Sequence, residues 1–191
     1  MERIKNIIQA SIDTKLHLLQ DEVLLKTIGD CVTILRKAFR NGNKVLFCGN
    51  GGSAADAQHL AAELSGRFYL DRACLPAEAL HVNSSYLTAV ANDHSFDFVY
   101  ARLVSGFGKK GDVLVALSTS GNSTNILHAV KAANDKGMTT IGLTGYDGGE
   151  LKSFCQHVIK VRSNDTPRIQ ESHILIGHII CELVEQQMFN P

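Results

Sequence analysis

The sequence predicts an α/β protein with a doubly wound, five-stranded parallel sheet and helices on both faces. Five short apolar runs predict the strands, at 45–48, 77–82, 113–117, 139–144 and 158–161. Segments with a helical pattern or turns separate these runs, as expected for the crossovers that join parallel strands. Short runs that are apolar at nearly every position are typical of a sheet buried on both faces.

The helices at the two ends of the chain have the clearest patterns. Apolar residues at helical spacing predict two helices in the first forty or so residues, which end at the turn signal Asn41-Gly42-Asn43. A last helix is expected from about Pro167, a favoured first-turn residue, to Met188. The two leading stripes are Ile4, Ile7, Ile8 and Ile12, and then Val23, Leu24, Ile28, Val32 and Leu35.

Composition narrows the possible partners and location. The 191 residues fit one domain, and 19 basic and 19 acidic side chains give a formal net charge of zero. This balance argues against a nucleic-acid partner. The five cysteines are widely spaced and never form C-x-x-C, which argues against a disulfide framework and favours the reducing cytoplasm. No signal peptide or membrane span is recognisable, so no membrane partner is expected.

A hydroxyl-rich loop, residues 118–123, follows the predicted strand 113–117 and precedes a helical pattern. The free N–H groups at a helix start, together with the helix dipole, favour an anion. Ser, Thr and Asn are also ordinary N-cap residues, so simple capping is the alternative. Four hydroxyls in six residues exceed that need, and the loop lacks the lysine of a nucleotide-triphosphate loop. We therefore expect a monophosphate site.

A glycine-rich turn, Gly49-Asn50-Gly51-Gly52-Ser53, follows the first predicted strand. In open parallel sheets, ligands bind beyond the carboxyl ends of the strands, where this turn and the hydroxyl-rich loop both lie. Its glycines permit close approach of a ligand to the backbone. The pattern alone leaves a ligand loop and an ordinary tight turn equally open.

Two helices carry candidate metal ligands. His59 and Glu63 share one helix face, and an imidazole with a carboxylate one turn apart suits a divalent metal such as zinc. The alternative is a solvated surface contact. The final helix carries Gln170, His173 and His178 among apolar residues, and each histidine is either a core residue or a functional one.

Together with Asn92-Asp93 and the segment 168–173, these motifs resemble the sugar isomerase (SIS) family, and within it the phosphoheptose isomerases, over nearly the whole chain. The resemblance implies a flavodoxin-like SIS fold in a single domain, residues 1–191. In that domain residues 1–42 are a helical pair that contributes to oligomerisation, and residues 43–191 are the α/β core. It also implies a homotetramer with active sites shared between subunits.

The implied activity is the conversion of D-sedoheptulose 7-phosphate into D-glycero-D-manno-heptose 7-phosphate through an enediol, at the start of heptose synthesis for bacterial surface glycans. Glu63 and His178 match the acid/base pair of such enzymes. One zinc per subunit is implied, with the matching ligands His59, Glu63, Gln170 and His178. The residues that match phosphate and sugar contacts are Asn50, Gly51, Gly52, Asn92, Asp93, Ser118, Thr119, Ser120 and Ser123, together with Glu63 and Gln170.

Helix geometry adds a constraint to the implied zinc site. Gln170 and His178 are eight residues apart, or about 12 Å along one continuous helix at about 1.5 Å per residue. Zinc holds nitrogen and oxygen ligands at about 2 Å. If both residues bind one metal, they come from different copies of that helix. A site shared between subunits is therefore expected.

One position departs from the family pattern. Some phosphoheptose isomerases have an aspartate, proposed to contact substrate, three residues before the glutamine that matches Gln170, and here that position is Pro167. The segment 166–171 also resembles a non-enzymatic relative that binds the bacterial replication initiator protein. A tetrameric scaffold without catalysis is therefore the alternative. The joint presence of His59, Glu63, His178 and the hydroxyl-rich loop favours the enzyme.

Overall fold

The computed structural model describes residues 1–189 and confirms the predicted α/β fold. All pairings in its five-stranded sheet are parallel, in the order β2-β1-β3-β4-β5. This order places β1 and β3 side by side in the middle, so the loops that follow these two strands are neighbours. The strands are β1 (Val45–Cys48), β2 (Ala77–Ala79), β3 (Val113–Leu117), β4 (Thr139–Thr144) and β5 (His157–Lys160).

The strand bounds agree with the prediction except at the two edges of the sheet. The edge strand β2 ends at Ala79, three residues before the predicted end at Val82. The chain turns there, with the Val82 N–H donating to the Ala79 carbonyl, and Asn83 then caps the next helix. The opposite edge strand, β5, begins and ends one residue earlier than predicted.

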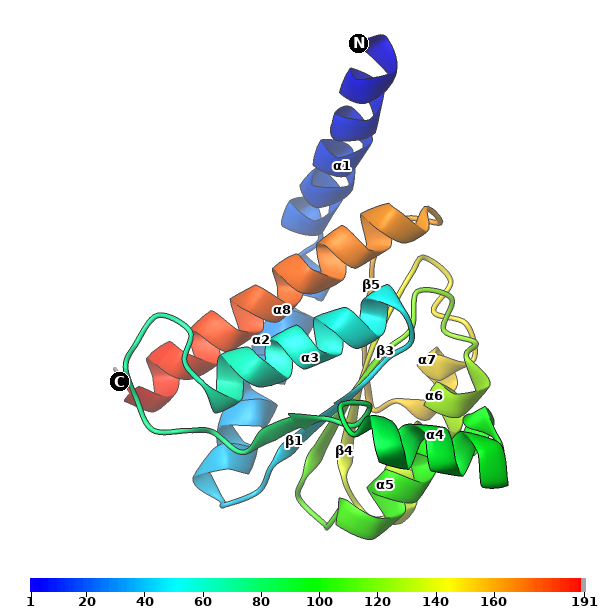
Figure 1. Ribbon diagram of the computed structural model, residues 1–191. Coiled ribbons are helices and arrows are strands. Elements are labelled where there is room, and N and C mark those ends of the chain that lie inside the picture. The colour runs from blue at the N-terminus through cyan, green and yellow to red at the C-terminus, as the bar shows by residue number, and fades with distance from the viewer. Residues whose placement is uncertain (190–191) are drawn as a thin grey trace.

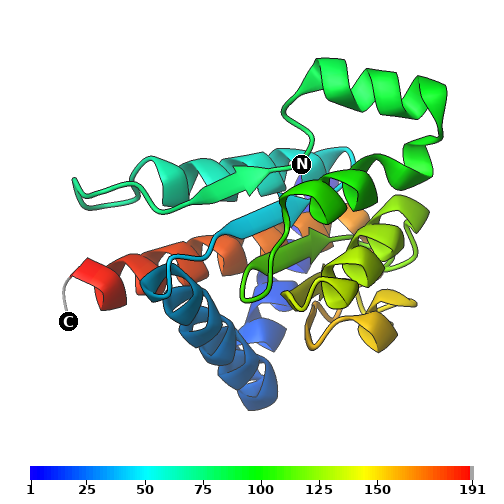
Figure 2. The ribbon, with the colours of Figure 1, turned by 90° about the horizontal axis from the view of Figure 1, so that it is seen from below.

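Helices cover both faces of the sheet in two layers (Figures 1 and 2). Side chains of β1 alternate between them, since Val45 and Phe47 join one apolar core and Leu46 and Cys48 join the other. Because both faces of the sheet are buried, the strands are apolar at nearly every position of the sequence. One layer holds α2 (Glu22–Arg40), α3 (Gly52–Ser65) and α8 (Thr166–Phe189). The other holds α4 (Ser84–Asp93), the 3-10 turn η1 (Phe96–Phe98), α5 (Val99–Phe107), α6 (Thr124–Asp135) and α7 (Leu151–Phe154).

In the first layer, α3 and α8 pack unusually closely at Gly177. A Cβ atom at this position would lie 2.5 Å from both terminal carbons of Leu60, which is far inside van der Waals contact. Glycine therefore permits this approach of the two helices without displacement of the Leu60 side chain. The neighbours of this contact in the sequence are His59 and His178, so the close packing brings these two side chains together.

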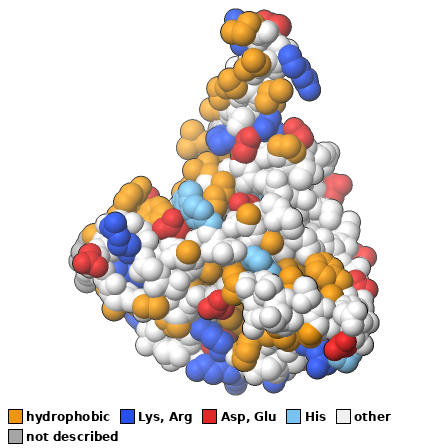
Figure 3. Space-filling model, viewed as in Figure 1, with side chains coloured by type: hydrophobic (Ala, Val, Ile, Leu, Met, Phe, Trp, Pro, Cys, Tyr) orange, Lys and Arg blue, Asp and Glu red, His pale blue; other side chains and the backbone are white. Residues whose placement is uncertain are grey.

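The first helix, α1 (Glu2–Gln20), projects away from the body of the molecule (Figure 1). It is tied to the start of α8 through Ser11, whose hydroxyl donates to Glu171 Oε2 at 2.7 Å. Several of its apolar side chains are exposed, with Ile4 and Ile8 at 56% and 55% of full accessibility, and Figure 3 shows hydrophobic side chains along the projecting helix. We define the α1 stripe as the exposed residues Ile4, Ile7, Ile8, Ile12, Leu16 and Leu19.

The two leading helices do not form a hairpin. Asp21 separates them and caps α2, because its side chain accepts a hydrogen bond from the Leu24 N–H at 3.0 Å. The second helix then packs its apolar face on the sheet and on α8. Across residues 1–189, every helix is too short or too polar to cross a lipid bilayer.

Candidate active site

Helices α3 and α8 bring together His59, Glu63 and His178, which we define as the His–Glu–His group. His178 Nε2 lies 3.0 Å from His59 Nε2, and the latter lies 3.1 Å from Glu63 Oε1. One potential ligand atom from each residue lies within 4.8 Å of the other two. The sequence could pair His59 with Glu63 on one helix face, whereas His178 reaches them only through the tertiary packing of α8 on α3.

The geometry of this group fits a zinc ion. In a tetrahedral site with ligands at about 2.0–2.1 Å, neighbouring donor atoms lie about 3.3 Å apart. The 3.0 and 3.1 Å separations in the His–Glu–His group are close to that value. Two imidazoles and a carboxylate are also a common zinc ligand set, and a fourth position would remain for a further ligand.

Gln170, the other predicted zinc ligand, lies elsewhere in the same chain. A Cβ atom at Gly52 would lie 2.5 Å from Gln170 Nε2, so the amide packs directly on the backbone at the start of α3. Gln170 and His178 both belong to the continuous helix α8. Three of the four predicted zinc ligands thus meet within one chain, and the fourth lies beside the glycine-rich turn.

The hydroxyl-rich loop lies between the end of β3 and the start of α6. Ser123 is the N-cap residue of α6, but its side chain makes no capping hydrogen bond. Its hydroxyl instead lies 3.2 Å from that of Ser118, while Ser120 Oγ accepts from the Asn122 N–H. Capping therefore does not account for Ser123, and the first turn of α6 has no side-chain cap to compete with an anion.

A small polar cavity of about 200 Å³ adjoins this loop. Thr119 and Ser120 line one side, and Ser163 and Thr166, from the segment that leads into α8, line another. The carboxylate-bearing residue Asp147 also lines it. Hydroxyl donors thus outnumber charged side chains in the cavity, which suits recognition of a phosphate by neutral groups.

The glycine-rich turn is held to the first turn of α6, directly after the hydroxyl-rich loop, by a pair of asparagines. Asn50 Nδ2 donates to Asn125 Oδ1 at 2.8 Å, and Asn125 Nδ2 donates to Asn50 Oδ1 at 2.9 Å. The Tyr100 hydroxyl, from α5, also holds this turn by donating to the Gly49 carbonyl at 2.6 Å. Sequence reasoning missed Asn125 and Tyr100, because neither stands out from the ordinary residues of a helix.

Asn92 and Asp93 end α4 in the other helical layer. Both side chains are exposed, and Asn92 Nδ2 donates to Asp93 Oδ1 at 3.0 Å. The helix α4 packs with η1 and α5, on the face of the sheet opposite to α3 and α8. Within one chain, these two predicted sugar contacts therefore lie in a different layer from the His–Glu–His group.

The two histidines of α8 have different surroundings. His173 is fully buried, and its Nε2 lies 3.1 Å from the Thr144 carbonyl, to which a neutral imidazole donates. Burial lowers the pKa of His173 to about 4, although its hydrogen bond to Thr144 opposes that shift. His173 is therefore a neutral core residue, whereas His178 belongs to the His–Glu–His group.

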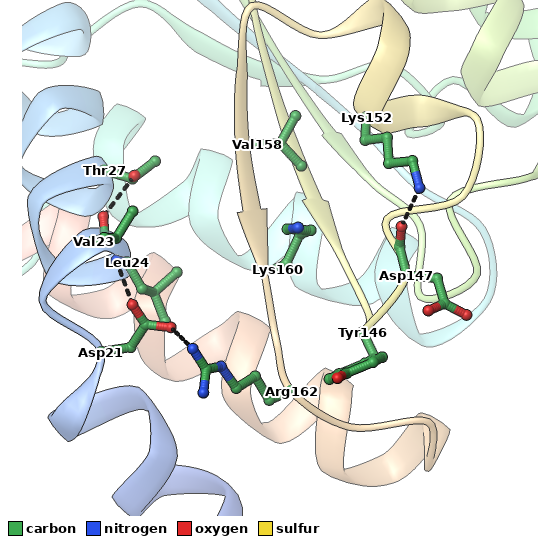
Figure 4. A pocket seen from close by; sticks show the side chains of 10 residues that line it. All are labelled: Asp21, Val23, Leu24, Thr27, Tyr146, Asp147, Lys152, Val158, Lys160 and Arg162. Atoms are coloured by element: carbon green, nitrogen blue, oxygen red, sulfur yellow. Dashed lines mark hydrogen bonds and ion pairs between the residues drawn. The ribbon is translucent and has the colours of Figure 1, made fainter.

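A larger cavity, of about 720 Å³, lies between the start of α2 and the end of β5 (Figure 4). Its lining contains none of the predicted site residues. Arg162 is paired with Asp21 at 3.0 Å, and Lys152 donates to the Asp147 carbonyl at 2.9 Å. Tyr146 and Asp147 line both this cavity and the small polar one, so the segment that carries them separates the two. Its size alone does not connect it with the chemistry of the His–Glu–His group.

Comparison with known proteins agrees with this fold. The SIS domain family model matches residues 10–145. Phosphoheptose isomerase from Clostridium acetobutylicum is 52% identical over 190 residues, covering 97% of each chain. The phosphoheptose isomerase of Aneurinibacillus thermoaerophilus is 50% identical over 186 residues, covering 97% of this chain and 94% of that protein.

Solved structures give the same result. The phosphoheptose isomerase structure from Neisseria gonorrhoeae superposes with a TM-score of 0.90 at 40% identity, covering 97% of this chain and 98% of that one. The structure from Francisella tularensis superposes with a TM-score of 0.93 at 36% identity and covers 97% of both chains. The chain therefore belongs to the SIS domain family and, within it, to the phosphoheptose isomerases.

Proposed function

We infer that the protein is an aldose-ketose isomerase that converts D-sedoheptulose 7-phosphate into D-glycero-D-manno-heptose 7-phosphate, a step in heptose biosynthesis. The His–Glu–His group carries this conclusion, because it supplies a carboxylate and imidazoles about 3 Å apart in a chain half identical to named phosphoheptose isomerases. A non-catalytic scaffold that binds the replication initiator protein is not favoured by these comparisons.

The reaction needs one group that moves a proton between carbons and one that serves the oxygens. We assign Glu63 as the base that removes a proton from C1 of the ketose, which gives an enediol, and returns it to C2. His178 is the acid that protonates the C2 oxygen, and the imidazole then takes the proton of the C1 hydroxyl as C1 becomes the carbonyl. Only Oε1 of Glu63 is paired with His59, which leaves its second carboxylate oxygen for the substrate.

Zinc is the proposed cofactor, at one ion per subunit. His59, Glu63 and His178 would hold it, with Gln170 of a neighbouring subunit as the fourth ligand. When bound, zinc supplies a Lewis acid that stabilises negative charge on the substrate oxygens. The proposal is supported by the ligand types and by the two separations of 3.0 and 3.1 Å that His59 makes with His178 and Glu63.

The substrate phosphate is proposed to bind the hydroxyl-rich loop through Ser118, Thr119, Ser120 and Ser123. Asn50, Gly51 and Gly52 are proposed to contact the sugar, as are Asn92 and Asp93, with Glu63 and Gln170 also in contact with substrate. Support comes from the uncapped start of α6 and from the paired side chains of Asn50 and Asn125, which hold the two loops together. Pro167 stands where some phosphoheptose isomerases have an aspartate proposed to contact substrate, and the proline side chain has no hydrogen-bonding group to make that contact.

A homotetramer with shared active sites is the proposed assembly. Gly52 and His59 are seven residues apart on α3, or about 10 Å along its axis, so the glycine-rich turn of one chain lies about two helical turns from its own His–Glu–His group. A site built from the loops and Gln170 of one subunit and the His–Glu–His group of another closes this gap. Each chain is proposed to be one SIS domain, in which residues 43–191 form the α/β core and the helical pair 1–42 contributes to contacts between subunits. Burial of the exposed aliphatic side chains of the α1 stripe would stabilise such contacts.

A cytoplasmic location completes the proposal. The five cysteines are all free, and Cys74 is exposed, which suits a reducing compartment. The partners are then a small sugar phosphate and further copies of the chain, with no nucleic acid or membrane required.

The direct test is turnover. Purified protein incubated with sedoheptulose 7-phosphate should form an aldoheptose phosphate, detected by NMR or mass-resolved chromatography. A strong chelator should abolish this conversion, and added zinc should restore it. Absence of product from the zinc-loaded protein would contradict the proposed activity, whereas full activity in chelator would contradict only the cofactor.

A further inference from the structure

A buried ion pair lies at the far end of α3, beyond the His–Glu–His group. Arg72 Nε donates to Glu185 Oε1 at 2.9 Å, and both side chains are only 2% exposed. Glu185 lies on α8 two turns past His178, and Arg72 lies in the segment between α3 and β2. Nothing in the proposed chemistry uses either residue, although a buried ion pair is costly to desolvate unless its geometry is well satisfied.

The Glu185 carboxylate organises the segment that follows α3. Its two oxygens accept hydrogen bonds from the backbone N–H groups of Phe68, Tyr69 and Leu70, at 3.0, 2.7 and 2.9 Å. Burial alone would raise the pKa of Glu185, but these three donors and Arg72 outweigh it, and the pKa lies below its usual value. The carboxylate is therefore ionised at neutral pH and fixes three consecutive residues.

The Arg72 guanidinium holds the carbonyl end of α3. Its Nη2 donates to the Glu63 carbonyl at 2.9 Å, and its Nη1 donates to the Leu64 carbonyl at 2.8 Å and to the Gly66 carbonyl at 3.2 Å. Carbonyls at a helix end lack partners within the helix, and a cation there is favourable. The helix turn that carries Glu63 is thus tied directly to the ion pair.

The same network reaches His178 from the other side. The Phe68 ring, whose backbone N–H is bonded to Glu185, lies with its centroid 5.8 Å from that of the His178 ring. One ion pair therefore restrains Glu63 through its own carbonyl and His178 through an aromatic neighbour.

We propose that Arg72 and Glu185 are positioning residues that fix the relative placement of Glu63 and His178, a role that rests on the proposed function. The pair touches neither substrate nor metal. Its effect is to keep the carboxylate and the imidazole at the spacing that zinc and the proton transfers require.

The test compares Glu185→Gln and Arg72→Lys with a matched control, Asp112→Asn. Asp112 is also a buried carboxylate, pairs with Lys44, and accepts from the backbone N–H groups of Lys44 and Lys109. It lies at the opposite, amino-terminal end of β3, away from the His–Glu–His group. Glu185→Gln replaces one accepting oxygen by an amide NH₂ group, which cannot accept hydrogen bonds from the backbone N–H groups. Arg72→Lys keeps the positive charge but removes the guanidinium that binds several carbonyls at once.

Three quantities are measured for each full-length variant: Tm, kcat and KM for sedoheptulose 7-phosphate, and the zinc Kd by competition with a chelating dye. Residues that orient metal ligands typically change metal affinity or activity by about 10–100-fold. We expect that loss in kcat and in zinc affinity for both ion-pair variants, with KM within about two-fold. The control should lower Tm while leaving kcat and zinc affinity at wild-type values.

Wild-type kcat and zinc affinity in a folded Glu185→Gln variant would overturn the positioning role, as would an equal loss in Asp112→Asn. If the ion-pair variants fail to fold, Phe68→Leu tests the contact between the Phe68 ring and His178 instead. It should reduce kcat a few-fold, and an unchanged kcat would overturn the proposal. An inactive wild-type protein would instead refute the proposed function, and zinc affinity would then decide the positioning role alone.

Discussion

The hydroxyl-rich loop and the His–Glu–His group are built in opposite ways. The loop is continuous in sequence, from Ser118 to Ser123, and its geometry follows from one strand end and one helix start. The His–Glu–His group joins residues 119 positions apart and exists only because α8 packs against α3. The proposed binding of the phosphate thus depends on local structure, whereas the proposed chemistry depends on tertiary packing and on assembly.

This difference predicts distinct responses to mutation. Changes in the loop should weaken substrate binding and leave the proton transfers intact. Changes in the His–Glu–His group, or in the contacts that align it, should reduce turnover at unchanged binding.

The largest effect is expected from the acid/base pair. Glu63→Gln and His178→Ala should each lower kcat by at least about 100-fold, since a positioned general acid or base typically contributes about 10²–10⁴-fold. Both residues lie outside the buried core, so circular dichroism and Tm should stay near the wild type. Glu78→Gln, at an exposed site on the edge strand β2, is the control and should retain full activity. Near-normal turnover in either variant would refute the assignment.

Disruption of the α1 stripe should have the next largest effect. Replacing Ile8 and Ile12 with glutamate puts two charges on the exposed apolar face and should yield smaller species in light scattering. If active sites are shared, kcat should fall at least about ten-fold, because Gln170 and the His–Glu–His group are separated. Asn6→Glu, on the opposite side of α1, is the charge control. A fully active monomer would exclude a shared site.

A smaller and different effect is expected in the hydroxyl-rich loop. A hydrogen bond to a charged group contributes about 1.5–3 kcal/mol, so Ser120→Ala or Ser123→Ala should raise KM by roughly 10–100-fold with little change in kcat. Thr33→Ala, on the exposed side of α2, removes a hydroxyl far from the loop and should leave KM unaltered. An unchanged KM in the two serine variants would contradict the phosphate role.

The last effect concerns stability and should leave the comparison of the two regions unchanged. The pKa of His173 falls to about 4 in the folded protein, so the unfolded chain binds a proton more readily between about pH 6.5 and 4. Stability should therefore decrease as the pH falls through this range, by on the order of 3 kcal/mol from this residue. Comparing Tm against pH for the wild type and His173→Gln should show a shallower slope in the variant. Parallel slopes would exclude His173 as the source.

Much of the fold followed from the sequence because its signals are local. The apolar runs predicted β1, β3 and β4 with the observed bounds, and Pro167 marked the start of α8 to within one residue. The sequence could not separate the roles of His173 and His178, since both lie among apolar residues and only packing buries the first. It also gave no sign of Asn125 or of the Arg72–Glu185 pair, whose contacts join segments more than seventy residues apart.

The glycine at 177 sets a limit on how this enzyme can diverge. Even alanine there would displace the end of the Leu60 side chain, so a larger residue at 177 fits more easily when position 60 also becomes smaller. Changes at the two positions should therefore be coupled. Directed evolution of new sugar specificity should therefore leave these two positions unchanged.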